Sequence, residues 1–457
     1  MNKRRHMHGL IFAVIAAAIL LTPLRARASD ANILTLDEVL RATLANNRVL
    51  VDSRLSGEIA SKELGWAKSQ RLPKFQLSYS LKEYGGLEPF AISIPSLGMN
   101  EVVAPAMPFR NSLGFKVTQF IYTGSRIEKG IEAASDQKKS AEADSAAQAA
   151  DVLMNAIRTY WDLSTTRSAE STIRKSIERE EAHLKDTRNS YEAGLATKND
   201  VLAAEVRLDK ERLMLLQAEN GSRLAAANLE YVASIAVGGR EIEEPSSVEP
   251  AEPPPVEELV KKAQVMQPAL EALQKQVEAA RAGVAVERSA KLPQVYVSAS
   301  ADVARPNAFI IPPEEKWKPI YMVGVFLDWT IWDGKATDFK TAKARLRAMQ
   351  AENRYAQQVE LITLEVTRAR LNLMNAAAKL KTARKGVERA TENYQVSSDL
   401  YRSGLGTSSD VIDAHSSLLE EELFVVRAMA EIEVMKAELR RATGELYWET
   451  RRSKSPN

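Results

Sequence analysis

Apolar and polar residues alternate in four short stretches of the chain, at 75–81, 113–121, 295–301 and 321–331. A period of two predicts β-strands. Each run lasts about ten residues, the length of a tilted membrane-spanning strand. Aromatic residues near the run ends are typical of a membrane-interface belt, and they are Tyr122, Trp317, Trp329 and Trp332. The alternative is a pair of hairpins in a soluble sheet.

The rest of the chain follows a helical period. No proline interrupts the chain between Pro108 and Pro245, or between Pro319 and Pro456, and proline ends helices. Both intervals are rich in Ala, Glu, Lys and Arg, with narrow apolar stripes. The stripe residues are Val152, Leu153, Ala156, Ile157, Tyr160 and Trp161, then Leu361, Val366, Leu373 and Leu380. Such stripes predict long helices that pack side by side as in coiled coils.

A glycine-centred motif occurs once in each of these intervals. Tyr191, Gly194, Leu195, Thr197, Asp200 and Val201 return as Tyr401, Gly404, Leu405, Thr407, Asp410 and Val411, a shift of 404 − 194 = 210 residues. A glycine turn between two helices predicts the tip of a helical hairpin, with a positive φ at the glycine. The hairpin is therefore duplicated.

The spacing before the two tips is equal. Gly124 to Gly194 and Gly334 to Gly404 are both 70 residues, and a helix filling such an interval is on the order of 100 Å long. The Leu-Pro pairs at Pro73 and Pro293 precede the two strand pairs. The ten extra residues of the first half lie in its inter-strand loop, 84–111.

Each half therefore reads as helix (about 35–71 and 256–290), strand, loop, strand, long helix, tip and returning helix (about 198–236 and 408–446). The predicted domains are a first repeat at 29–236, a linker at 237–256, a second repeat at 257–446 and a C-terminal tail at 447–457. A signal peptide is expected at 1–28, because basic residues precede a short apolar run and Ala26 and Ala28 suit a cleavage site. A retained membrane anchor is the alternative.

The composition limits which partners and which stabilising features the chain can have. Without the leader the formal charge changes from +2 to 57 − 60 = −3, so the basic pI does not indicate nucleic acid. The chain has no cysteine, which excludes disulfides, thiolate metal sites and a lipid anchor on Cys. We expect packing and oligomerisation to stabilise it instead.

Four strands are too few to close a membrane barrel, because every backbone amide in lipid needs a partner and about eight strands is the smallest closure. A chain with two membrane-type hairpins must share a barrel with its own copies. Two copies give eight strands with little lumen, and three copies give twelve strands with a pore.

The signal peptide, the repeated order of elements and the two tip motifs resemble the TolC family of outer-membrane efflux proteins over essentially the whole chain. The resemblance implies an α+β membrane protein: a homotrimeric twelve-stranded barrel, continued by an α-helical coiled-coil barrel across the periplasm. The interrupted helices, the linker and the tail would form an equatorial girdle.

The implied function is a passive outer-membrane exit duct for efflux or type I secretion. A periplasmic adaptor and an inner-membrane transporter of RND or ABC type would energise it. The alternative is a soluble periplasmic coiled-coil scaffold, in which the apolar strand faces would be buried within the protein rather than turned to lipid.

Two aspartates are candidates for a periplasmic gate. Asp410 and Asp413 lie three residues apart at a helix start, hence on one face, and threefold symmetry would stack them into two carboxylate rings. The resemblance implies such a pair at the gate, with Tyr401 nearby. Some family members carry an Arg where this chain has Gly406, which leaves the Tyr401 hydroxyl for the closing contacts. The alternative role is to complement the helix dipole; the first repeat has Ala203 at the position of Asp413.

The resemblance further implies that the tips meet the adaptor through Gly194, Leu195, Thr197, Gly404, Leu405 and Thr407. Alternatively, the two leucines only pack under their own turns. His183 and His415 are isolated along predicted helices, without metal-ligand spacing or a catalytic pattern. We therefore expect no metal, no cofactor and no enzymatic activity.

Overall fold

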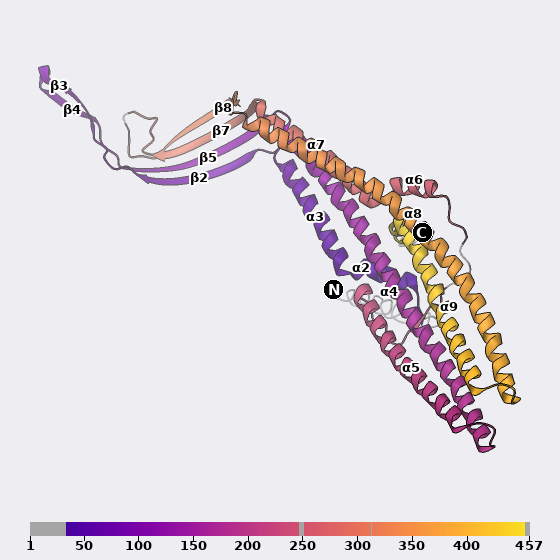
Figure 1. Ribbon diagram of the computed structural model, residues 1–457. Helices are drawn as coiled ribbons and strands as arrows, with labels where there is room; N and C mark the ends of the chain where they lie inside the picture. The colour runs from indigo at the N-terminus through magenta and orange to yellow at the C-terminus, as the bar shows by residue number, and fades with distance from the viewer. Residues whose placement is uncertain (1–32, 246–250, 312, 453–457) are drawn as a thin grey trace, which may run out of the picture. The chain divides into compact units, whose positions relative to one another are not determined.

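A computed structural model describes residues 33–245, 251–311 and 313–452 (Figure 1); the predicted signal peptide lies outside these ranges. The chain divides into two compact units. The first, here called the tip unit, contains residues 33–45, 155–245 and 376–434. The second, the strand unit, contains residues 46–154, 251–311, 313–375 and 435–452.

Two long helices dominate the chain. α4 (Arg126–Glu192) and α8 (Ala336–Arg402) each have 67 residues, as the equal spacing predicted. α5 (Lys198–Ala233) and α9 (Ser408–Ala442) return beside them. Ion pairs link α4 with α5, as between Arg212 and Glu181 at 2.9 Å, and Lys379 and Glu431 link α8 with α9 at 2.6 Å. The first hairpin is α4 with α5, and the second is α8 with α9.

The helix predicted at 35–71 is two helices, α2 (Leu36–Asn46) and α3 (Arg48–Ser69). Asn47 separates them and accepts a hydrogen bond from the Val49 amide at 3.0 Å, which caps α3. The helix predicted at 256–290 is likewise broken, into α6 (Val256–Met266) and α7 (Pro268–Arg288). Gln267 precedes a proline, a position that disfavours helical backbone, and its ψ is 112°.

Four antiparallel strands form one sheet in the strand unit. They are β2 (Lys74–Glu83), β5 (Phe109–Tyr122), β7 (Gln294–Arg305) and β8 (Lys318–Asp328), in the order β2-β5-β7-β8. All four predicted strands are confirmed. The central β5–β7 pair joins the two repeats, with Leu113 opposite Val303. Within the described residues β2 and β8 pair on one side only.

The apolar residues of the two edge strands are exposed. The four that alternate along β2 (Phe75, Leu77, Tyr79 and Leu81) are at least 65% exposed, and Tyr321, Val323 and Val325 of β8 are at least 72% exposed. These faces are therefore not buried within the chain, as a soluble sheet or scaffold would require. Transfer of such apolar surface from water is favourable.

Smaller strands were not predicted. β3 (Phe90–Ile94) and β4 (Met99–Ala104) make a hairpin inside the loop 84–111, joined by a 3₁₀ turn at Pro95–Leu97. In the tip unit, β1 (Ile33–Leu34) pairs in parallel with β6 (Glu241–Ile242). Part of the predicted linker is thus an ordered strand. A short 3₁₀ turn at Ser289–Lys291 precedes β7, and α10 (Glu445–Arg452) follows α9.

Each unit has a narrow core between helices. In the strand unit it contains Leu259, Ala263, Leu270, Ile362, Val366, Ala369 and Ala442. In the tip unit it contains Ile173, Ile177, Leu184, Ala204, Leu208 and Leu419. None of the helices in the described ranges combines the length and apolar composition needed to cross a membrane.

Candidate functional site

The two hairpin tips have nearly identical turns. Gly194 and Gly404 have φ values of 75° and 74°, as the motif predicted. The Leu195 amide donates to the Ser190 carbonyl at 2.8 Å, and the Leu405 amide donates to the Leu400 carbonyl at 2.9 Å. These bonds satisfy the last carbonyls of α4 and α8, so each long helix ends in a glycine cap.

Reciprocal hydrogen bonds start each returning helix. Asp410 Oδ2 accepts from the Thr407 amide at 3.0 Å and from the Thr407 hydroxyl at 2.6 Å, and Asp200 and Thr197 repeat this arrangement. The hydrogen bonds from the threonines lower the pKa of both aspartates. Asp410 therefore has a capping role that Asp200 shares.

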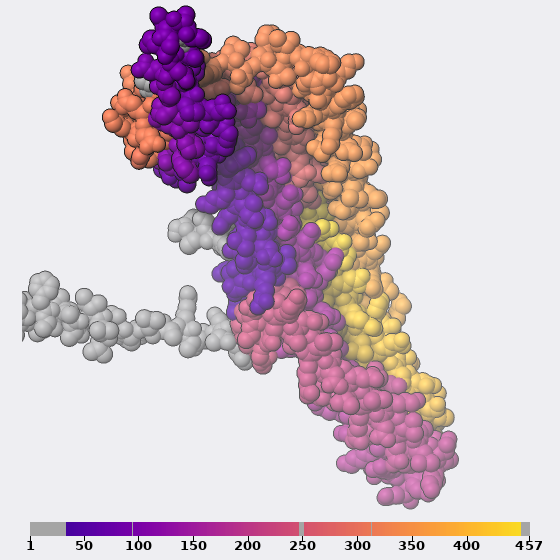
Figure 2. Space-filling view, turned by 90° about the vertical axis from the view of Figure 1, so that its left-hand side faces the viewer, coloured from indigo at the N-terminus to yellow at the C-terminus, as the bar shows by residue number. Residues whose placement is uncertain are grey.

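The leucines of the tips project into solvent. Leu195 is 84% exposed and Leu405 is 79% exposed, so the alternative that they pack under their own turns is wrong. In Figure 2 the first tip, coloured magenta, forms the lower end of its hairpin. Each tip therefore presents one exposed leucine on a capped turn.

The candidate gate residues lie at the second tip. Asp413 is exposed and lies one turn beyond Asp410. The half-buried Tyr401 reaches the first hairpin, where its hydroxyl is 3.3 Å from Thr187 Oγ1. Arg402 and Asp186 add an ion pair at 3.4 Å. A Cβ at Gly406 would lie 3.1 Å from Leu400 Cβ, so a larger residue there would require its neighbours to move.

Polar contacts also join the hairpins above the tips. Arg179 pairs with Glu422 at 2.7 Å, and the buried His183 ring lies 3.1 Å from Ser408 Oγ. Burial lowers the pKa of His183 to about 4, so this imidazole is neutral near pH 7 and a hydrogen bond, rather than a charge, links it to α9.

A buried cluster around His415 was missed by sequence reasoning. His415 is isolated along the chain, but in space it lies against Ser176 and Glu180 of α4 and Glu211 of α5. Burial raises the pKa of Glu180 to about 7. Hydrogen bonds from His415 and Ser176 help to lower the pKa of Glu211 despite its burial. The three helices are far apart in sequence, so no local pattern reveals the cluster.

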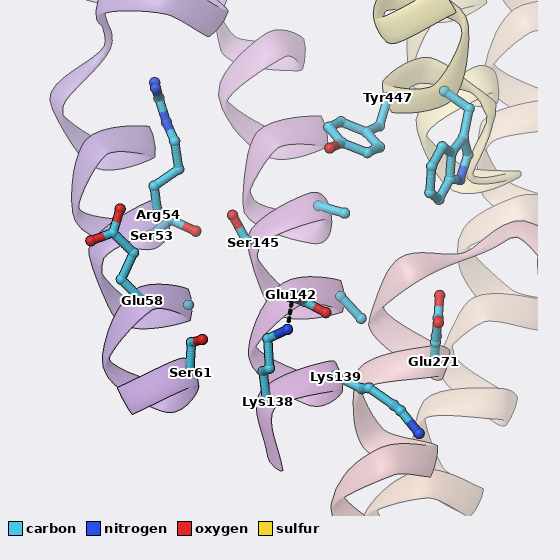
Figure 3. A pocket seen from close by; sticks show the side chains of 14 residues that line it. Ser53, Arg54, Glu58, Ser61, Lys138, Lys139, Glu142, Ser145, Glu271 and Tyr447 are labelled. Atoms are coloured by element: carbon cyan, nitrogen blue, oxygen red, sulfur yellow. Dashed lines mark ion pairs between the residues drawn. The ribbon is translucent and has the colours of Figure 1, made fainter. Parts of the chain in front are cut away.

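The strand unit contains a cavity of about 660 Å³ among α3, α4, α7 and α10 (Figure 3). Its lining mixes acidic and basic side chains, and Lys138 already pairs with Glu142 at 3.2 Å. Charges that neutralise each other along one helix face are typical of a solvated surface. We assign no ligand to this cavity.

Comparisons with known proteins support the family that the sequence predicted. The family described as "Outer membrane efflux protein" matches residues 39–233 and 259–445. The chain is similar to the outer membrane efflux protein BepC of Brucella suis biovar 1, with 22% identity over 95% of this chain and 90% of that protein.

Solved structures share the fold. The outer-membrane channel OprN superimposes with a TM-score of 0.75 at 18% identity, covering 90% of each chain. CusC, whose structures concern folding and transmembrane channel formation, gives a TM-score of 0.77 at 14% identity, covering 91% of this chain and 92% of that one. The predicted family, fold and outer-membrane location are confirmed, and family and fold are those of channels rather than enzymes. The chain is an outer-membrane exit channel and belongs to the outer membrane efflux protein family.

Proposed function

We propose that three copies of the chain form the channel, with a closed barrel of 4 × 3 = 12 strands. The observation that carries this proposal is the four-stranded sheet with β2 and β8 as its edges and exposed apolar residues on both. In a bilayer such edges require partners. Pairing of β8 with β2 of the next copy closes the sheet by cyclic symmetry.

The channel is passive and acts with two partners. A periplasmic adaptor contacts the tips through Leu195, Leu405 and the turns beside them, and an inner-membrane transporter of RND or ABC type supplies the energy. Support for the adaptor contact comes from the exposed leucines at both tips.

Purification tests the assembly. We expect the protein in the outer-membrane fraction, and light scattering in mild detergent should give three chains per particle. Recovery as a monomer in detergent, or in the soluble periplasm, would contradict the trimeric duct and favour a scaffold.

The gate consists of the carboxylates of Asp410 and Asp413, stacked as two rings around the threefold axis. Asp413 is exposed, and within the described residues its carboxylate has no hydrogen bond or ion pair. Asp410 is also exposed, but one oxygen caps α9. Asp413 is therefore the residue whose charge is most available to a cation, while Tyr401 holds the second tip against Thr187 of the first hairpin.

Replacing Asp413 by Asn should weaken the block of single-channel current by multivalent cations. We expect a roughly tenfold rise in the half-blocking concentration, because the variant loses three charges at the constriction. Asp200→Asn is the control for loss of a carboxylate near a tip: Asp200 is the counterpart of Asp410, and the first repeat has Ala203 at the position of Asp413, so this variant removes three charges outside the proposed rings. Unchanged block in Asp413→Asn, or equal changes in both variants, would show that Asp413 does not line the pore.

A further inference from the structure

We propose that Glu180, Glu211 and His415 bind one divalent transition-metal ion, of which Zn²⁺ is the representative. The three side chains come from α4, α5 and α9, so the ion would bridge the first and second hairpins of one chain.

The spacing of the donor atoms suits a small cation. His415 Nε2 lies 3.1 Å from Glu211 Oε1, 3.8 Å from Glu180 Oε2 and 2.8 Å from Ser176 Oγ, and the ion would replace the hydrogen bond between Nε2 and Glu211. All three candidate ligand atoms lie within 4.8 Å of one another. Bonds of about 2.1 Å place neighbouring zinc ligands about 3.0–3.4 Å apart, and opposite ligands at most about 4.2 Å apart. The 3.1 Å pair matches neighbouring ligands, and the 3.8 Å pair lies between the two values.

Two polar atoms of the cluster lack hydrogen-bond partners. The side chains of Glu180 and His415 are each 1% exposed. Glu180 Oε1 and His415 Nδ1 have no partner among the described residues. Buried polar atoms are normally hydrogen-bonded. Glu180 Oε1 belongs to the same carboxylate as Oε2, which lies 3.8 Å from His415 Nε2, so a cation held between these two groups would give the Glu180 carboxylate a partner. His415 Nδ1 lies on the other edge of the ring from Nε2, and this cation would not satisfy it.

Glu211 is already held in a fixed orientation. Ser176 Oγ donates to Glu211 Oε2 at 2.9 Å, and Arg207 Nε donates to Glu211 Oε1 at 3.1 Å. The Tyr394 ring packs edge-on against His415 with a centroid distance of 5.5 Å. Such outer contacts orient metal ligands and are part of functional metal sites.

The chemical types of the three candidate ligands indicate which class of metal would bind. One imidazole nitrogen and two carboxylates suit Zn²⁺ and neighbouring first-row ions, whereas Ca²⁺ and Mg²⁺ prefer oxygen alone. Two ionised carboxylates together in a protein interior repel each other, and a divalent ion offsets that repulsion.

The test uses the full chain, purified in detergent without a histidine tag, treated with EDTA and dialysed against Zn²⁺. We expect elemental analysis to find one Zn²⁺ per chain, and Co²⁺ in its place to give visible absorption bands. Glu180→Gln and His415→Gln each remove a ligand while nearly keeping side-chain size. Each should weaken Zn²⁺ binding by at least about 100-fold.

His183→Gln is the matched control, because His183 is the other described histidine and is also buried between the hairpins. This variant should bind Zn²⁺ like the unmodified chain. Thermal unfolding separates a metal site from a packing cluster: Zn²⁺ should raise the midpoint of the unmodified chain and leave that of Glu180→Gln unchanged. Absence of bound Zn²⁺ and Co²⁺, or undiminished binding by folded Glu180→Gln, would overturn the proposal.

Discussion

Replacing Gly124 by Ala is expected to destabilise the protein by about 2–5 kcal/mol. Gly124 has a φ of 62° at the junction of β5 and α4, where an alanine costs about 1–2 kcal/mol. A Cβ there would also lie 2.7 Å from Leu292 Cβ and 3.1 Å from the Ser289 carbonyl, and such overpacking costs a further 1–3 kcal/mol or so. The midpoint of urea unfolding in detergent micelles measures the loss.

Gly130→Ala is the control for Gly124→Ala. Gly130 lies in α4, and apart from its chain neighbours and the nearby backbone of α4, no described atom lies within 4 Å of a Cβ built there. This change should stabilise by about 0.5–1 kcal/mol, because glycine is unfavourable inside helices. Trimming Leu292 to Ala should not rescue Gly124→Ala, since the clashing Cβ remains. Equal midpoints for Gly124→Ala and Gly130→Ala would show that the contact with Leu292 is easily displaced.

Gly334 occupies the equivalent junction of β8 and α8 but has an open environment in the chain, with a φ of 67° and nothing within 4 Å of a built Cβ. β5 places Gly124 beside Leu292 because β5 pairs with β7. In the proposed trimer β8 pairs with β2 of the next copy, which would place Gly334 beside that copy's Leu-Pro segment in the same way. The proposed trimer would therefore give Gly334 the kind of neighbour that Gly124 has within the chain.

Short local sequence patterns explain why much of the fold was predictable. The equal lengths of α4 and α8 follow from glycines at both ends and the absence of proline between them. The strands alternate clearly because the two faces of a strand point to opposite sides of the sheet, and in the proposed barrel one side meets lipid and the other the lumen. Both signals are contained in a few adjacent residues.

The identity of the buried side chains and the helix interruptions were less predictable from the sequence. The stripe of α8 was expected at Leu361, but Leu361 is 45% exposed and the adjacent Ile362 is fully buried. Both residues are large and apolar, so only the neighbouring helices select one. The interruption at Asn47 was missed because a single capping side chain causes it. The His415 cluster needs three helices at once, which no local pattern encodes.

Replacing Leu195 and Leu405 together by Asp is expected to abolish docking of the adaptor and hence export, while the trimer and its conductance in bilayers stay intact. Both side chains are about four-fifths exposed, so the folded chain loses little contact. A buried apolar anchor contributes about 2 kcal/mol or more to an interface, and an unpaired carboxylate there adds a desolvation cost. Together these effects weaken binding by more than about 100-fold.

The chain contains no cysteine, so a single Cys introduced at Ala193 gives a unique attachment point for a crosslinker beside the first tip. In native cells the crosslinked adaptor should disappear in the double Asp variant and persist in Leu195→Met with Leu405→Met, which keeps an apolar surface at both turns. Loss in both variants would instead indicate that the shape of leucine is recognised. Full crosslinking and export in the Asp variant would show that the adaptor contact does not depend on these two leucines, because an interface built on them would not tolerate two buried charges.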